Sequence, residues 1–193
     1  MIINPYMFSC HTLKDCSRLL VMIWVSTFFL PAIGVLVMRG AGLITSLQME
    51  ERMERVGPMI MSAVLYLWLA RNFYHSPSVP KLLSIFVLGA AISLLISFST
   101  NLFYKLSLHA VAMGGWLALT VMMFRYFDFG SFDVRIGQAI CHIGLVYWLL
   151  YVLFVTGLVG SARLALGAHR PGEVMWGYFV GALGQWIAYV VLS

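Results

Sequence analysis

Long uncharged stretches constrain this chain more than any other feature of its sequence. They lie between Arg18 and Arg39, Arg55 and Arg71, Lys81 and Lys105, Lys105 and Arg125, Arg135 and Arg163, and from Glu173 onward. A membrane-spanning helix needs about 20 predominantly apolar residues, and five of the six stretches reach that length directly. The second must borrow residues 71–74, with Arg71 reaching toward the headgroups. With 62% hydrophobic and only 10% charged residues, the chain is too apolar for a soluble domain of its size.

The sequence therefore predicts an all-α, polytopic membrane protein: a six-helix bundle forming a single domain over residues 1–193. The expected spans are residues 19–38, 58–74, 82–100, 107–125, 136–160 and 174–192. Pro31 should kink the first span, which neighbouring helices tolerate in a membrane. His142 falls inside the fifth span, where we expect a buried histidine with a structural partner. In the last span Gly177, Gly181 and Gly184 form a small-residue face suited to close helix packing.

Charge excludes some functions. The net charge of +5 comes from basic residues scattered singly near the predicted helix ends, as expected where Lys and Arg meet lipid headgroups. No basic run of the kind that follows a nucleic-acid backbone is present, so the expected partner is membrane lipid and not nucleic acid. Cys10, Cys16 and Cys141 lack metal-ligand spacing, and we expect neither a metal nor another cofactor.

The connection before the last span concentrates polar chemistry. Arg163, His169 and Glu173 lie within eleven residues, between two long apolar runs. Pro171 suits the first turn of a helix, which would place Glu173 where the helix dipole favours a carboxylate. A helix N-terminus also attracts anions. On spacing alone, an anion site and a polar loop with snorkelling arginines are about equally good interpretations.

A family resemblance favours the anion site. Arg163, five residues, His169, three residues and Glu173, followed by Gly177 and Gly181, resembles the third signature of the type 2 phosphatidic acid phosphatase family. In that signature an Asp stands where this chain has Glu173, and a Ser commonly stands where it has Ala162. The family's second signature ends in Ser-Gly-His, and residues 105–109, Lys-Leu-Ser-Leu-His, are similar to it. The nearest counterpart of the first signature, a Lys followed by Arg-Pro, is residues 51–58. The resemblance covers roughly residues 50 to 181.

The resemblance implies a role for each matching residue. His169 would attack phosphorus and form a phosphohistidine, with Glu173 orienting its imidazole, and a protonated His109 would serve as the general acid for the leaving group. The expected phosphate-binding residues are Arg163, Lys105, Arg52, Arg55 and Ser107. From its position, Ser107 is also a good N-cap for the fourth span. For residues 48–55, a solvated amphipathic helix remains the alternative.

Connection parity supports one shared site. With six spans, the first, third and fifth connections lie on the same side of the membrane, and these are the connections that hold the three candidate segments. The basic residues, however, are equally divided between the two sides. On the other side are Lys14, Arg18, Arg71, Lys81, Arg125 and Arg135; on the candidate side are Arg39, Arg52, Arg55, Lys105, Arg163 and Arg170. If four of the latter bind phosphate, the remaining balance favours cytoplasmic termini. We then expect a bacterial inner membrane protein with its site facing the periplasm.

The predicted function is metal-independent hydrolysis of a lipid phosphate or diphosphate monoester. Phosphatidic acid, phosphatidylglycerophosphate, undecaprenyl diphosphate and lipid A phosphates all fit, and the sequence does not choose among them. Two alternatives stay open: a family member that binds lipid phosphate without hydrolysing it, and a small membrane scaffold or transporter subunit. Assembly into a homo-oligomer is compatible with all three.

Overall fold

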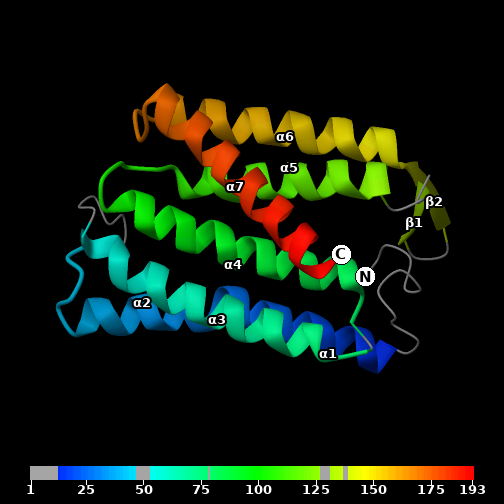
Figure 1. Ribbon diagram of the computed structural model, residues 1–193, viewed down its shortest axis with the longest axis horizontal. Coiled ribbons are helices and arrows are strands. Elements are labelled where there is room, and N and C mark those ends of the chain that lie inside the picture. The colour runs from blue at the N-terminus through cyan, green and yellow to red at the C-terminus, as the bar shows by residue number, and fades with distance from the viewer. Residues whose placement is uncertain (1–12, 47–52, 78, 127–130, 137–138) are drawn as a thin grey trace.

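The protein is described by a computed structural model that covers residues 13–46, 53–77, 79–126, 131–136 and 139–193. It is a bundle of long helices (Figure 1). Their bounds are α1 Leu13–Trp24, a π-helical segment Val25–Phe29, α2 Leu30–Gly40, α3 Val56–Tyr74, α4 Lys81–Asn101, α5 Leu108–Tyr126, α6 Leu145–Ala165 and α7 Pro171–Leu192. A short 3-10 helix, Met53–Arg55, precedes α3, and an antiparallel hairpin, β1 Ser131–Ile136 and β2 Ala139–Gly144, precedes α6.

The predicted fold class, an all-α bundle of membrane helices, is confirmed, but the described residues contain five candidate spans and not the predicted six. In the described part of the chain, five helices are long and apolar enough to cross a membrane: Ser17–Gly40, Lys81–Asn101, Leu108–Arg125, Leu145–Ala165 and Pro171–Leu192. The helix missing from this set is α3. Its apolar stretch is interrupted by Gly57 and Pro58 at the start and by Arg71 and Asn72 in the last turn. It still runs alongside α4 from one end of the bundle to the other (Figure 1).

The predicted span over residues 136–160 is also wrong at its start. Residues 131–136 and 139–144 form the hairpin, with Asp133 paired in register with His142, and α6 begins at Leu145. The β-branched residues Val134, Ile136, Ile140 and Ile143 favour strands, whereas apolarity alone does not separate a strand from a helix. His142 is consequently exposed on the hairpin and is not the buried histidine that the sequence predicted.

The first span is irregular close to Pro31, where the sequence predicts a kink. Its helix runs through α1 and α2, with a π-helical segment that ends at Phe29, two residues before Pro31. Proline has no backbone N–H and its ring clashes with the preceding turn, and a π-bulge is one way in which a helix relieves this.

Close packing of α7 holds the centre of the bundle together. A Cβ added at Gly177 would lie 2.8 Å from the Cβ of Ala110, and one at Gly181 would lie 2.6 Å from the backbone nitrogen of Gly115. One at Gly184 would lie 2.8 Å from the carbonyl oxygen of Gly89. These distances leave no room for a side chain, so the glycine face fits directly against α5 and α4. The predicted close packing of this face is confirmed, and such contacts matter because lipid offers no hydrophobic gain for helix association.

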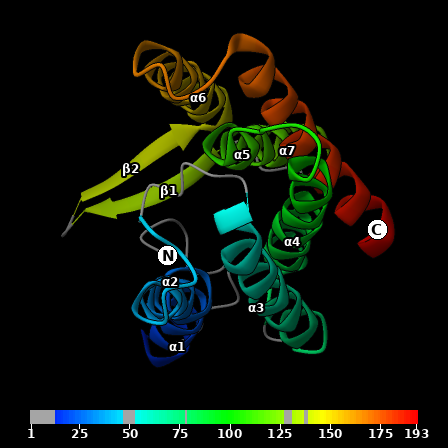
Figure 2. The ribbon, with the colours of Figure 1, turned by 90° about the vertical axis from the view of Figure 1, so that its left-hand side faces the viewer.

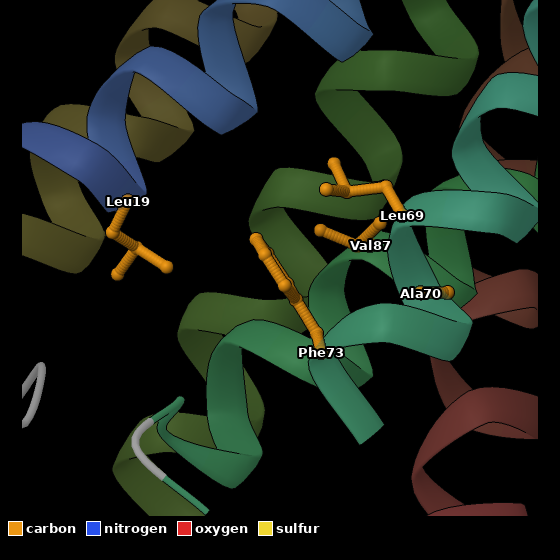
Figure 3. Packing of buried hydrophobic residues seen from close by; sticks show 5 residues of the cluster. All are labelled: Leu19, Leu69, Ala70, Phe73 and Val87. Atoms are coloured by element: carbon orange, nitrogen blue, oxygen red, sulfur yellow. The ribbon is translucent and has the colours of Figure 1, made fainter. Parts of the chain in front are cut away.

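A compact apolar cluster lies near the end of the bundle where α3 finishes. It joins α1, α3 and α4 through Leu19, Leu69, Ala70, Phe73 and Val87 (Figure 3). Large apolar side chains on the outer faces of the helices, including Val21, Phe28, Leu36, Tyr147 and Phe154, are exposed. A soluble protein does not expose so much contiguous apolar surface. The chain is therefore an integral membrane protein whose outer helix faces meet lipid.

Candidate functional site

Three connections gather at one end of the bundle. The α2–α3, α4–α5 and α6–α7 connections all lie at the left-hand end of Figure 1, and Figure 2 views that end directly. They hold the three candidate segments of the sequence. The three connections meet at one end because α3, although less apolar than the five candidate spans, traverses the bundle beside them. That they share one side of the membrane stays a prediction, which requires α3 to span it.

A cavity of about 300 Å³ opens at this end. Four polar residues from three separate parts of the chain line it: Arg55 before α3, His109 in the first turn of α5, Arg163 in the last turn of α6, and His169 before α7. The remaining lining is mostly apolar and comes from Pro58, Met59, Ser62, Leu94, Leu106 and Leu108. The cavity thus combines cationic and imidazole groups with an apolar wall.

His169 is held in place by its own loop. Gly167, with φ of 62°, makes the left-handed turn that ends α6, a conformation that glycine adopts without strain. Arg170 is extended and Pro171 opens α7, as the sequence predicted. The Nδ1 of His169 then lies 2.7 Å from the Oε2 of Glu173, with the two side chains only 5% and 12% exposed. This contact fixes the ring and leaves Nε2 outside the pair.

The charged groups around His169 shift its pKa in opposite directions. Burial is the main cause that lowers the pKa of His169 below its ordinary value; the hydrogen bond and charge of Glu173 raise it, and Lys105 and Arg163 lower it. Burial prevails, so the imidazole is neutral at neutral pH. A neutral imidazole that donates its Nδ1 proton to a carboxylate keeps a lone pair on Nε2.

Two arginines, Arg55 and Arg163, line the same cavity. Arg163 is half-buried, and its Nε has no hydrogen-bond partner among the residues that the structure describes. The pKa of Arg55 is lowered, first by burial and also by the charge of Arg163, while Glu173 raises it. Since burying an unpaired cationic N–H group is unfavourable, the unpartnered Nε of Arg163 favours an anion in this cavity, and Arg55 adds a second positive charge there.

Lys105 and Ser107 lie beside the cavity but do not line it. The Nζ of Lys105 donates to the carbonyl oxygen of Ala168 at 3.2 Å, so the lysine supports the His169 loop from outside. Ser107 is fully buried, and its Oγ accepts the backbone N–H of Ala110 at 3.4 Å, as predicted for an N-cap. That position does not support the phosphate-binding role expected for Ser107. Arg52 lies outside the described residues.

The sequence analysis missed a clamp next to Arg55. The Oε1 of Glu54 accepts hydrogen bonds from the backbone nitrogen of Thr45 at 2.7 Å and from its Oγ1 at 2.6 Å. These bonds lower the pKa of the Glu54 carboxyl, the side-chain bond most, so it is ionised at neutral pH. They tie the turn that presents Arg55 to the loop after α2, where Ile44 is buried. No local signal pairs Thr45 with Glu54.

The described part of the chain contains no group of three or more His, Cys, Asp or Glu side chains arranged to hold a metal ion. No family model, curated protein or solved structure matches the chain.

Proposed function

We propose that the chain is an integral membrane phosphatase that hydrolyses a lipid phosphate or diphosphate monoester through a phosphohistidine, as the resemblance to type 2 phosphatidic acid phosphatases implies. The observation that carries the proposal is the joint placement of the His169–Glu173 pair, His109, Arg55 and Arg163 at one cavity. Phosphoryl transfer needs little more than a positioned nucleophile, an acid and cations for the phosphoryl oxygens.

The proposed first step begins at His169. Its Nε2 lone pair attacks phosphorus as the bond to the leaving oxygen breaks, and Glu173 stabilises the imidazolium that develops. Arg163 and Arg55 bind the phosphoryl oxygens, which carry the charge of the transition state. His109, in its protonated form, gives a proton to the leaving oxygen. Water, which gives a proton back to His109, then attacks phosphorus; the phosphorus–nitrogen bond breaks, its electron pair returns to Nε2, and phosphate is released. Lys105 supports the loop and adds positive charge nearby.

The substrate class follows from the cavity's surroundings. A cationic pocket with an apolar wall at the end of a membrane bundle suits a phosphorylated head attached to a hydrocarbon tail. A soluble phosphate ester would leave the apolar wall uncovered. This supports a lipid substrate without choosing its headgroup.

The direct test is a phosphate-release assay on purified protein in excess EDTA, over a panel of lipid phosphates and diphosphates. We expect release by the wild type, at least about 10³-fold less by His169→Ala, and an acid-labile phosphoenzyme that the variant does not form. His75→Ala is the matched control, because His75 is exposed after α3, at the opposite end of the bundle. Activity in His169→Ala would refute the nucleophile, and phosphate-dependent thermal stabilisation without release would indicate a binding protein instead.

For localisation, we propose a bacterial inner membrane with cytoplasmic termini and the cavity facing the periplasm. Cysteines introduced at Ser46 and Ala168 should react with an impermeant reagent added to intact spheroplasts, while one at Ser76 should react only after lysis. The opposite pattern would invert the orientation, and labelling of Ser46 and Ser76 from the same side would refute the shared-side arrangement.

A further inference from the structure

The helix that carries Arg163 to the cavity is mostly exposed in its second half. There, Thr156 and Gly160 are the buried residues of α6. In the first half of α6, the ring of Trp148 packs edge-on against that of Trp116 of α5. From the cavity end, α6 and α7 diverge along the bundle (Figure 1). The position of Arg163 therefore depends on what Thr156 and Gly160 contact.

Both buried residues contact the same side chain, that of Tyr178 in α7. The Oη of Tyr178 donates to the carbonyl oxygen of Thr156 at 2.7 Å. A Cβ added at Gly160 would collide with this Oη, and it would lie 3.2 Å from the Cζ of the same ring. It would also lie 3.4 Å from a methyl carbon of Val174. Gly160 thus provides a notch in α6 that the phenol of Tyr178 fills.

Tyr178 is itself fixed from the side of α5. A Cβ added at Gly114 of α5 would lie 2.7 Å from the Cα of Tyr178 and 2.8 Å from its carbonyl carbon, so the backbone of α7 lies directly on α5 here. From this backbone the phenol reaches α6. A tyrosine side chain has only two rotatable bonds before its hydroxyl and is rigid. The ring therefore sets the separation of α6 from α7 at this level.

This link lies close to the groups of the candidate site. Gly160 precedes Arg163 by three residues, which is about 4.5 Å along α6. Tyr178 follows Glu173 by five residues, which is about 7.5 Å along α7. The Nε of Arg163 has no hydrogen-bond partner among the described residues, so the placement of its guanidinium follows that of the helix and not a bond at Nε.

We propose that Tyr178 is a positioning residue for the phosphate site: its hydroxyl holds the last turns of α6 against α7 and thereby sets the distance from Arg163 to the Nε2 of His169. Tyr178 is not among the residues that line the cavity, so it acts through Arg163. Displacing a catalytic group by about 1 Å can cost about 10²-fold in rate. The role of Arg163 in this inference rests on the proposed function, whereas the link between the two helices does not.

The first test is a double-mutant cycle, measured as kcat/KM on an activated aryl phosphate so that weak variants remain measurable. Tyr178→Phe keeps the ring and removes the hydroxyl. It should lower kcat/KM about three- to tenfold, because the loss of one net hydrogen bond shifts the helices toward unaligned positions. Tyr147→Phe is the matched control, since Tyr147 is exposed on α6, and it should match the wild type.

The cycle shows whether Tyr178 acts through Arg163. In an Arg163→Ala background, Tyr178→Phe should cost less than about twofold, since the group that it positions is already gone. In an Arg55→Ala background it should keep its full effect, because Arg55 precedes α3 and is not carried by α6. A loss that is the same in the wild-type and Arg163→Ala backgrounds would show a general structural role and overturn the inference.

A second pair of variants tests the notch. Gly160→Ala places a methyl group where the Oη of Tyr178 lies and should lower kcat/KM more than Tyr178→Phe does. Combined with Tyr178→Phe, the methyl group meets no hydroxyl, so the double variant should be more active than Gly160→Ala alone. If Gly160→Ala does not fold, recovery of a folded protein by Tyr178→Phe, checked by size exclusion and thermal unfolding, is the equivalent result. A double variant worse than Gly160→Ala would contradict the notch.

Spin labels separate this inference from the proposed function. With the three native cysteines replaced by serine, labels on cysteines at the exposed positions Leu164 and Met175 report the distance between α6 and α7 by double electron–electron resonance in nanodiscs. Tyr178→Phe should broaden the distance distribution, and Tyr147→Phe should leave it unchanged. If the protein neither hydrolyses nor binds phosphate but the distribution still broadens, the proposed function fails and the helix link stands. An active wild type with an unchanged distribution in Tyr178→Phe would leave the phosphatase standing and overturn the link.

Discussion

The two ends of the bundle have similar sets of basic residues and differ in how these are buried. At the end opposite the cavity, Arg18, Arg71, Lys81 and Arg125 are all exposed. At the cavity end, Arg39 and Arg170 are exposed as well, but Arg55, Lys105 and Arg163 are half-buried, and Lys105 and Arg163 act on the charge of His169. Counting charges on the two sides gave a tie, whereas burial separates them. A cation at a headgroup layer is ordinary, but a half-buried guanidinium whose Nε has no partner among the described residues, as at Arg163, favours an anionic ligand.

The largest expected difference between the ends is the loss of activity when a histidine is replaced: at the cavity, His109 or His169, and on the hairpin, His142. His109→Ala should lower kcat/KM on a lipid phosphate by about 10²–10⁴-fold, because a poor alkoxide leaving group needs the proton that His109 supplies. With an activated aryl phosphate, His109→Ala should recover most of its activity and His169→Ala should not. His142→Ala, on the exposed hairpin, should match the wild type on both substrates. An equal loss on both substrates would reassign His109 to phosphate binding.

The next effect compares two arginines. Arg163→Ala should lower kcat/KM about 10²–10³-fold, as expected when one group that stabilises transition-state charge is removed. Arg71→Ala, which removes an exposed arginine at the other end, should change activity less than threefold. The measurement is steady-state kinetics in matched micelles. Similar losses in both variants would mean that burial does not distinguish the ends.

A smaller effect tests the Glu54 clamp. Thr45→Val removes the hydroxyl that donates to Glu54 and should raise KM about three- to tenfold with little change in kcat, since it loosens Arg55 without touching the reacting atoms. Thr45→Ser should restore the wild-type KM. The clamp predicts that Thr45→Val and Glu54→Gln together cost about as much as either alone. Strict additivity would show that Thr45 and Glu54 act separately.

The mildest effect is the dependence of wild-type activity on pH. His169 must be neutral to attack, and its pKa lies below the ordinary value of about 6.5. On an activated aryl phosphate, which does not need the proton of His109, the kcat/KM profile should therefore be flat from neutrality down to the pKa of His169 and decline below it. Glu173 raises this pKa, so Glu173→Gln should shift the acidic limb to lower pH while lowering the plateau, because the imidazole loses its orienting partner. A shift to higher pH would contradict the placement of Glu173.

Helix identity was largely predictable, whereas the ends of the helices were less so. The apolar runs gave α4, α5 and α7 within a few residues, since each run is long and bounded by charge or proline. The hairpin was not predicted, because residues 131–144 combine β-branched residues with an apolar run that is equally compatible with a helix. The apolar stretch of α3 is shorter than a membrane span requires, because polar residues interrupt an apolar run that was already short.

The contacts of the candidate site also differ in how well the sequence predicted them. His169 and Glu173 lie four residues apart, so a helix start brings them together by local geometry, and the family resemblance implied their contact. Ser107 is the N-cap that the sequence predicted, and its phosphate-binding role stays a prediction, because an N-cap hydroxyl and a phosphate donor need the same residue type. Thr45 with Glu54, and Tyr178 with Thr156, depend on contacts between distant segments.

Hydropathy, residue size and spacing over a few residues act locally along the chain. They were enough to predict that this chain lies in a membrane, that its helices pack through a glycine face, and which loop holds the imidazole–carboxylate pair. Which cations lie at the cavity, and that an unsatisfied amide oxygen, the Oε1 of Gln185, lies in the interior, are properties of the folded bundle alone. Burial and hydrogen-bond satisfaction depend on every helix that packs around a group, and no single stretch of sequence contains that information.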